Sequence, residues 1–221
     1  MSEVHSAAIT LLTLCSMCAG AAAGEGPPND FVRLADIAPG VKQDIRYAGD
    51  NNFIGRPVPG YVAPQCWLRR EVAEALAAAQ KEAESEGLRL VVYDCYRPQR
   101  ATKAFIAWAQ DAADQAMKTL YYPNIDKKAL FELGYIAKAS AHSTGLAVDI
   151  GIVGLDFGTP FDLFDEASAT HNPNVGAAAK ANRAKLFALM QRHGFSNLPQ
   201  EWWHFALEGV KDAPPQDFEV R

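Results

Sequence analysis

Two histidines, an aspartate and a glutamate in this sequence are the residue types that a hydrolytic metal site requires. His142 and Asp149 lie close together in the chain, and far downstream Glu201 precedes His204 by three positions. Two imidazoles and one carboxylate can hold a catalytic zinc ion while leaving one position open. We therefore predict that His142, Asp149 and His204 bind one zinc ion per chain. Glu201, which is not a ligand, is predicted to be the general base.

The spacing of these residues indicates a loop followed by a strand. His142 and Asp149 do not form a helical i, i+4 pair, and Gly145 between them permits a tight turn. Residues 145–153 alternate as a strand does, which places Asp149 on the same face as two small residues, Ala147 and Gly151. That face leaves room for a metal ion. Each motif alone is weak, and the prediction depends on their combination.

Hydrophobic periodicity predicts the elements that must position these residues. Helices are expected at 67–86, 98–117 and 177–193. Strands are expected at 88–93, 145–153 and 202–207.

The remaining segments are expected to be irregular. Residues 31–65 are rich in Gly and Pro and are predicted to form loops and short strands. The polar tail after Val210 is expected to lie over the surface. Because helices and strands do not alternate regularly, the predicted fold is α+β, with a small, largely antiparallel sheet flanked by helices.

Composition is that of a packed globular protein. The chain has 221 residues, of which 49% are hydrophobic and 21% charged, and its net charge is −5. This size fits one domain. Without a basic run or a Gly-rich phosphate loop, the sequence predicts no nucleic acid partner. It is compatible with a homo-oligomer.

The N-terminal residues resemble an export signal. The segment 7–23 is apolar or small throughout and ends in an Ala-rich stretch, so we predict a signal peptide at 1–23, a linker at 24–30 and the zinc domain at 31–221. We therefore expect a periplasmic or secreted protein whose mature chain has no membrane span. Glu3, with no Lys or Arg beside it, departs from the usual signal pattern. A mis-assigned start or an apolar tail is the alternative, and a lipid anchor at Cys15 or Cys18 is less favoured.

Two cysteines remain after removal of that signal. Cys66 and Cys95 are an even pair in a chain expected to be exported, which predicts a disulfide. Closing this loop would stabilise the fold by about 3.5 kcal/mol on a chain-entropy basis. The alternative is two buried free thiols.

Taken together, the motifs resemble those of a known family. Ser140-x-His142-x-x-Gly145-x-Ala147-x-Asp149 together with Glu201-x-Trp203-His204 is similar to the zinc D-alanyl-D-alanine dipeptidases. That family lies within the group of D,D-carboxypeptidases and hedgehog-like zinc domains. Similar matches extend over residues 31–220: Tyr47 to Tyr61, Asp94-x-Tyr96-Arg97-Pro98, Tyr121 to Asp126, Gly158-x-x-Phe161-Asp162 and Phe164-Asp165-Glu166.

The resemblance implies further roles. Arg97 would stabilise the oxyanion of the attacked amide, and Asp94 would orient Arg97. Ser140 would bind the substrate carboxylate, whereas Tyr47 and Asp162 would meet its free amino group. One departure is that Ala141 stands where the vancomycin-resistance members carry a second serine.

The function implied is zinc-dependent hydrolysis of D-Ala-D-Ala. A D,D-carboxypeptidase that trims peptidoglycan stem peptides is the closest alternative, because it would share the metal site. A zinc-stabilised binding domain without catalysis is the alternative from another class. The presence of both Glu201 and Arg97 favours an enzyme.

Overall fold

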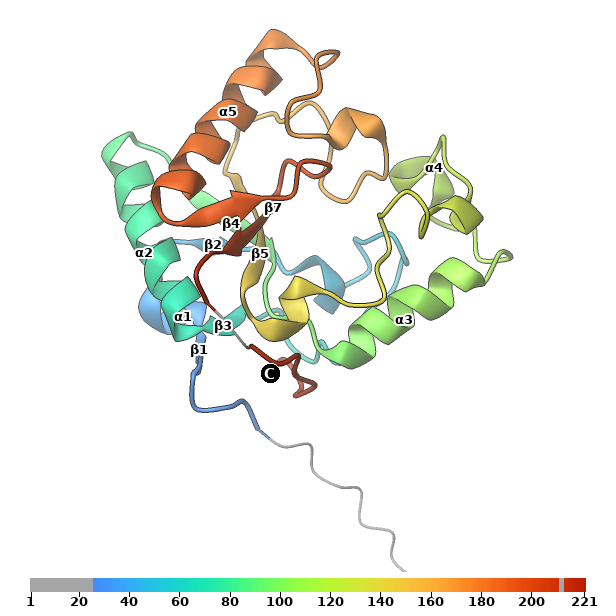
Figure 1. Ribbon diagram of the computed structural model, residues 1–221, viewed down its shortest axis with the longest axis horizontal. Helices are drawn as coiled ribbons and strands as arrows, with labels where there is room; N and C mark the ends of the chain where they lie inside the picture. The colour runs from blue at the N-terminus through green and yellow to red at the C-terminus, as the bar shows by residue number, and fades with distance from the viewer. Residues whose placement is uncertain (1–25, 211–212) are drawn as a thin grey trace, which may run out of the picture.

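The structure, a computed structural model, describes residues 26–210 and 213–221 (Figure 1). At its centre is a five-stranded sheet in the order β2-β4-β5-β7-β6. Its strands are β2 (Lys42–Gln43), β4 (Leu90–Asp94), β5 (Ala147–Ile152), β6 (Phe195–Asn197) and β7 (His204–Leu207). Only β2 and β4 run parallel, and the other neighbours are antiparallel. The predicted α+β class with a largely antiparallel sheet is confirmed.

Helices lie on two sides of this sheet. In Figure 1, α2 and α5 stand together to the left of the strands, and α3 lies to the right. The helices are α1 (Leu34–Ile37), α2 (Arg70–Ser85), α3 (Gln99–Gln110), α4 (Lys118–Tyr121) and α5 (Ala177–Arg192). Single 3-10 turns are η1 (Arg46–Ala48), η2 (Lys127–Ala129), η3 (Ala141–Thr144) and η4 (Glu166–Ser168).

The first predicted helix begins three residues later than expected. A strand, β3 (Trp67–Arg69), precedes α2 and pairs with β1 (Phe31–Arg33) in a separate two-stranded sheet. The helical spacing of apolar residues includes Leu68, but pairing with a distant segment decided the conformation of residues 67–69.

The second predicted helix ends earlier than Met117. Lys127 is buried, and its Nζ donates to the carbonyl oxygens of Trp108 and Asp111 at 2.9 and 3.0 Å. A lysine from a later segment therefore satisfies carbonyls at the end of α3 that another helical turn would otherwise have used.

The C-terminal tail lies over the surface as predicted at Pro214, Pro215 and Asp217, but two later residues are anchored in the core, which the sequence analysis did not predict. Phe218 is 5% exposed and stacks on Tyr96 with ring centroids 4.1 Å apart. Val220 is fully buried, and its backbone N–H donates to the carbonyl of Gly60 at 2.8 Å. The apolar residues of the tail gain burial only because segments distant in sequence supply the pocket.

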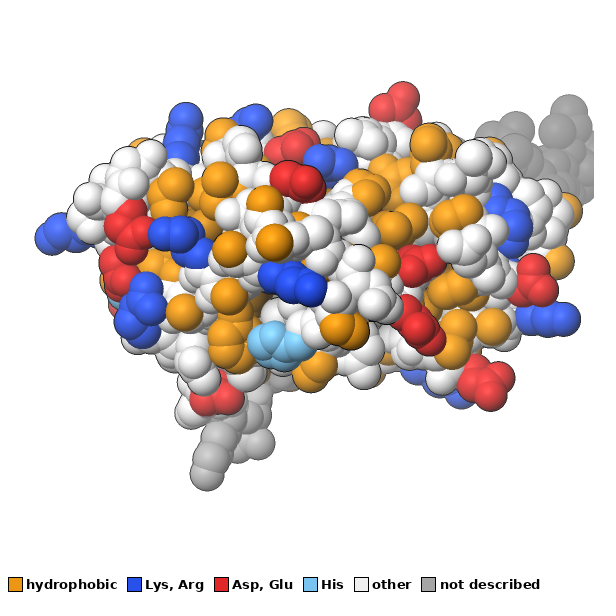
Figure 2. Space-filling model, turned by 90° about the horizontal axis from the view of Figure 1, so that it is seen from above, with side chains coloured by type: hydrophobic (Ala, Val, Ile, Leu, Met, Phe, Trp, Pro, Cys, Tyr) orange, Lys and Arg blue, Asp and Glu red, His pale blue; other side chains and the backbone are white. Residues whose placement is uncertain are grey.

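Cys66 and Cys95 form the predicted disulfide, with their Cα atoms 5.3 Å apart. Both residues are buried. The predicted signal peptide at 1–23 lies outside the described residues. Within 26–210 and 213–221, no helix combines the length and apolar character needed to cross a membrane. On the face shown in Figure 2, basic and acidic side chains are interspersed rather than gathered by sign.

Candidate metal centre and active site

The register of three neighbouring strands places three polar residues in one row. Asp94 on β4 lies opposite Asp149 on β5, and Asp149 lies opposite His204 on β7. Directly opposed residues point to the same face of an antiparallel sheet. An irregularity in β4 between Val92 and Asp94 shifts the pairing before this row begins. The sheet thereby joins residues that are up to 110 positions apart in the chain.

His142 reaches this row from η3, which precedes β5. The Ser140 hydroxyl caps the turn by accepting the backbone N–H of His142 at 3.2 Å. Gly145 ends the turn at φ 76°, and a Cβ at this position would lie 2.4 Å from the ring of Phe31. Glycine is therefore required at 145 both by backbone conformation and by close packing.

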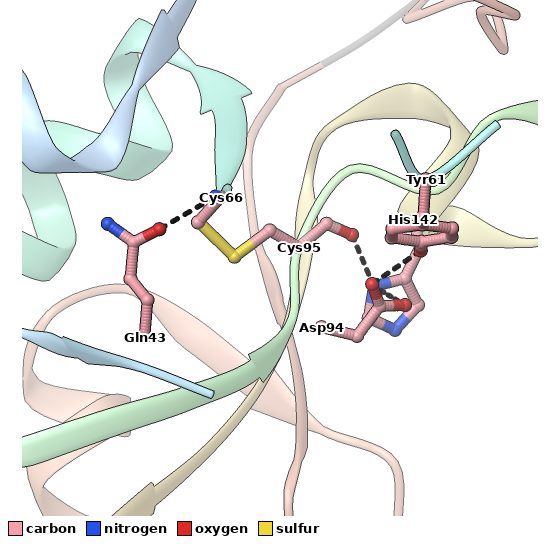
Figure 3. Close-up of a disulfide and its surroundings, with 6 residues drawn as sticks. All are labelled: Gln43, Tyr61, Cys66, Asp94, Cys95 and His142. Carbon is pink, nitrogen blue, oxygen red and sulfur yellow. Dashed lines mark hydrogen bonds and ion pairs between the residues drawn. A yellow bond between two sulfur atoms is a disulfide. The ribbon is translucent and has the colours of Figure 1, made fainter. Parts of the chain in front are cut away.

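The ring of His142 is oriented by a backbone carbonyl. Its Nδ1 lies 2.8 Å from the carbonyl oxygen of Cys95, a contact drawn in Figure 3. A carbonyl only accepts hydrogen bonds, so Nδ1 carries the proton. This fixes the tautomer in which Nε2 has a free lone pair for a metal.

Three ligand atoms converge on one point. Nε2 of His142, Nδ1 of His204 and Oδ1 of Asp149 lie 3.0 to 3.2 Å from one another. Ligands about 2.0–2.1 Å from a tetrahedral zinc ion would be roughly 3.3 Å apart. The donor set and its spacing therefore fit a divalent cation such as zinc, and the same three residues form a potential metal-binding group.

Charge is arranged to keep this aspartate ionised. Burial opposes ionisation of Asp149, but His142 and His204 outweigh that effect and lower its pKa. An ionised carboxylate beside two imidazoles is the protonation state that a metal ligand needs.

Asp94 lies between Arg97 and the predicted metal ligand His142. Its Oδ2 accepts from Nη2 and Nε of Arg97 at 2.8 and 3.0 Å and lies 3.5 Å from Nδ1 of His142. Its Oδ1 accepts from the hydroxyl of Tyr61 at 2.6 Å, and the carboxylate is fully buried. A buried carboxylate with three donors is well compensated for the loss of water. Its partners are then held in place.

Arg97 is held over the cavity. Its guanidinium lies 5.2 Å from the ring centre of Tyr47 and 4.8 Å from that of Phe105, within cation–π range. Nη2 is 3.9 Å from Oδ2 of Asp149. With Asp94 fixing one edge, the other donors of the guanidinium are available to a ligand.

Glu201 lies close to the ligand atoms without joining them. Its Oε2 is 3.9 Å from Nδ1 of His204, and its side chain is 15% exposed. Burial raises the pKa of Glu201 to about 7. A carboxyl group with this pKa can both accept and return a proton near neutral pH.

Tyr47 and Asp162 meet at one part of the cavity. The Tyr47 hydroxyl donates to Oδ2 of Asp162 at 2.7 Å, and both residues are buried. Asp162 has a φ of 62° and is the only non-glycine residue with positive φ in 26–210 and 213–221. Burial, followed by the negative charge of Asp149, raises the pKa of Asp162 to about 8. The charge of Arg97 lowers this pKa only partly, and among the described residues no Lys, Arg or His forms an ion pair with Asp162.

These side chains share one cavity of about 180 Å³. Of the residues predicted to bind metal, react or bind substrate, every one lines it: Tyr47, Arg97, Ser140, His142, Asp149, Asp162, Glu201 and His204. Asp94 lies behind Arg97. Of the lining residues that the sequence left without a role, Phe53, Phe105 and Phe164 form a contiguous aromatic cluster, and Tyr135 stacks on Phe164.

Tyr61 is the supporting residue that sequence reasoning missed. It fell within the matching stretch from Tyr47 to Tyr61, but nothing in the local pattern pointed to Asp94. Only the tertiary structure shows that its hydroxyl bonds to this carboxylate.

Comparison with known proteins gives extensive matches. The family described as D-ala-D-ala dipeptidase matches residues 28–219. A D-alanyl-D-alanine dipeptidase of Enterococcus faecium is 37% identical over 190 residues, which cover 83% of this chain and 93% of the relative. One from Streptomyces coelicolor is 37% identical over 194 residues, or 85% and 95% of the two chains.

Among solved structures, the similarity is more distant. A mutant of the vancomycin resistance D,D-pentapeptidase VanY, in complex with Zn(II), is 18% identical with a TM-score of 0.42. The match covers 69% of this chain and 79% of that chain.

The extent of the sequence matches makes the chain a metallopeptidase. More narrowly, it belongs to the D-ala-D-ala dipeptidase family. The family and the enzyme class predicted from the sequence are therefore confirmed.

Removing the hydroxyl of Tyr61 is expected to weaken the support of Asp94. Tyr61→Phe should lower the free energy of unfolding by about 1–3 kcal/mol, because it removes a hydrogen bond to a buried charge. Urea denaturation followed by circular dichroism measures this change. Tyr122→Phe is the control, because the Tyr122 hydroxyl makes a 3.4 Å contact with a neutral carbonyl. Equal losses in the two variants would contradict the proposed importance of the Tyr61 bond.

Proposed function

We propose that this protein is a zinc-dependent dipeptidase that hydrolyses D-Ala-D-Ala to two molecules of D-alanine, with Glu201 as general base. Membership of the D-ala-D-ala dipeptidase family supports this substrate. The observation that carries the proposal is the single cavity, in which the three ligand atoms, Glu201 and Arg97 lie together with the buried Tyr47–Asp162 pair.

His142, Asp149 and His204 would hold the zinc ion, which when bound would supply a Lewis acid and lower the pKa of water to about 7. The chain's own residues provide the proton transfer. Glu201 would take a proton from the attacking water and later deliver it to the leaving amino group, consistent with its pKa of about 7.

Arg97 would stabilise the negative charge that develops on the amide oxygen. Because Asp94 and two aromatic rings already hold the guanidinium, little reorganisation is needed during the reaction. A preorganised donor of this kind is worth roughly 3–4 kcal/mol of transition-state stabilisation.

The two ends of the cavity would recognise the two charged ends of the substrate. Ser140 accepts a hydrogen bond from His142, so its own hydroxyl proton is free to be donated to a carboxylate. At the other end, a substrate ammonium would give Asp162 the cationic partner that it lacks. A longer peptide without that ammonium would leave Asp162 buried with only Tyr47 as a partner.

The amine end of the cavity favours a dipeptidase over a carboxypeptidase. Tyr47 contacts the rings of Phe53 and Phe105, at centroid distances of 5.9 and 4.9 Å. If Asp162 and Tyr47 meet the substrate's amino group, these buried rings would stand where a peptide extended at its amino end would continue. An open groove would be required for a D,D-carboxypeptidase that acts on stem peptides.

Glu201→Gln is expected to retain metal but to lose activity. Because the amide cannot accept the proton from water, kcat for D-Ala-D-Ala should fall by about 10²- to 10⁴-fold. The measurement is release of D-alanine, accompanied by metal analysis of the purified protein. Wild-type protein should cleave D-Ala-D-Ala but neither L-Ala-L-Ala nor N-acetyl-D-Ala-D-Ala, and a chelator should abolish the activity.

Two results would count against this function. If Glu201→Gln binds metal and its kcat is undiminished, Glu201 is not the general base. Zinc-replete wild-type protein without activity on any D,D-peptide would favour a binding domain, and preferential cleavage of the N-acetylated substrate would favour a carboxypeptidase.

Asp162→Asn is expected to impair recognition of the free amino group. Loss of one charge-assisted hydrogen bond should lower kcat/KM for D-Ala-D-Ala by about 10- to 100-fold. N-acetyl-D-Ala-D-Ala, which lacks the ammonium and is not expected to be cleaved by the wild type, should remain uncleaved by the variant. Asp156→Asn is the matched control, because Asp156 is exposed in the segment that leads to Asp162. A kcat/KM for D-Ala-D-Ala that is unchanged in Asp162→Asn, or lowered equally in Asp156→Asn, would show that Asp162 does not recognise the amino group.

We further propose that the mature protein acts in the periplasm or outside the cell, in dipeptide salvage or wall turnover. The disulfide supports this, because disulfides persist in oxidising compartments. Cell fractionation with an antibody to the protein should locate the processed chain outside the cytoplasm. Full-length protein in the cytosol would contradict the proposal.

A further inference from the structure

We propose that the Cys66–Cys95 disulfide is a positioning device for the metal ligand His142, in addition to stabilising the fold. This inference rests on the proposed metal site. The connection is short: Cys95 contributes both a sulfur to the bridge and the carbonyl oxygen that orients His142 (Figure 3).

Cys95 lies at a point where the regular sheet no longer fixes the chain. The paired part of β4 ends at Asp94, and its register is already irregular between Val92 and Asp94. At this point Asp94 must nevertheless hold its carboxylate 2.8 Å from Arg97, and Cys95 must hold its carbonyl oxygen 2.8 Å from His142. A covalent link at 95 restrains both contacts.

The other end of the bridge is anchored independently of the active site. The backbone N–H of Cys66 donates to Oε1 of Gln43 at 2.8 Å, and its carbonyl accepts from the N–H of Leu34 at 2.9 Å. Gln43 belongs to β2, which pairs with β4. Figure 3 shows the resulting path from Gln43 through the disulfide to His142.

Burial of the bridge favours a permanent structural part over a reversible switch. Cys66 and Cys95 are 0% and 1% exposed, so a thiol reductant cannot reach either sulfur without local opening. A bridge that is always present can hold a carbonyl in one place. Groups that orient a metal-binding histidine typically affect metal affinity by about 10- to 100-fold.

A stabilising role alone predicts a different outcome from a positioning role. A bridge that only restricts the unfolded chain lowers stability when it is removed, but leaves the folded site unchanged. A bridge that positions His142 also changes metal affinity and ligand geometry in protein that is still folded.

The test compares the wild type with Cys66→Ala/Cys95→Ala, both prepared without metal and measured well below their unfolding temperatures. Zinc affinity is measured by competition with a chromophoric chelator, and ligand geometry by the visible absorption of the Co²⁺ form. We expect zinc to bind about 10-fold or more weakly to the variant and the Co²⁺ spectrum to change. kcat/KM at saturating zinc should fall as well.

Met190→Ala is the matched control. It removes a buried side chain from α5, a helix that contributes no residue to the lining of the cavity, and it should lower stability. Its zinc affinity and Co²⁺ spectrum should remain those of the wild type. Equal zinc affinity and identical spectra in the double cysteine variant would overturn the inference, however much its unfolding temperature falls.

A second pair of variants serves if the double cysteine variant does not fold. Gln43→Ala removes the amide oxygen that accepts from Cys66, whereas Gln43→Glu places a carboxylate oxygen there as the acceptor. Zinc affinity should fall in Gln43→Ala and recover in Gln43→Glu, and equal affinities would overturn the inference. Wild-type protein that binds no divalent cation would instead overturn the proposed metal site itself.

Discussion

A concentration of buried and partly buried carboxyl groups is the constraint on which the rest of this structure depends. Asp149, Asp162 and Glu201 line one small cavity, and Asp94 lies directly behind it. Among the residues that line the cavity there is no lysine, and Arg97 is the single arginine. Removing so much negative charge from water is unfavourable unless cations compensate for it. The cavity is therefore suited to a divalent ion at one place and a substrate ammonium at another.

The surroundings of these carboxyl groups differ, and so do the roles for which each group is suited. Asp94 accepts three hydrogen bonds, and the two histidines lower the pKa of Asp149, so Asp149 is suited to remain ionised. Glu201 and Asp162 have raised pKa values because burial dominates. Titratable groups pushed in opposite directions by their surroundings are typical of sites that combine metal binding with proton transfer.

Much of the site could be predicted from the sequence because its residues occur in short motifs. The turn from Ser140 to Gly145 is encoded locally, by a capping hydroxyl and a glycine at positive φ. Prediction failed where long-range pairing competes with local pattern. Leu68 continues a helical periodicity but forms a strand with β1, and Phe218 lies in a polar tail but packs against Tyr96.

By itself, the sequence determined the chemistry: which side chains can bind a metal, exchange a proton or carry charge, and which cysteines can pair. The tertiary structure alone decided how these groups meet. The register that aligns Asp94, Asp149 and His204 depends on backbone hydrogen bonds among three strands. The contacts of Tyr61 with Asp94 and of Cys95 with His142 likewise join distant segments. Local propensity carries no information about such contacts, because their energy arises only when the whole chain is packed.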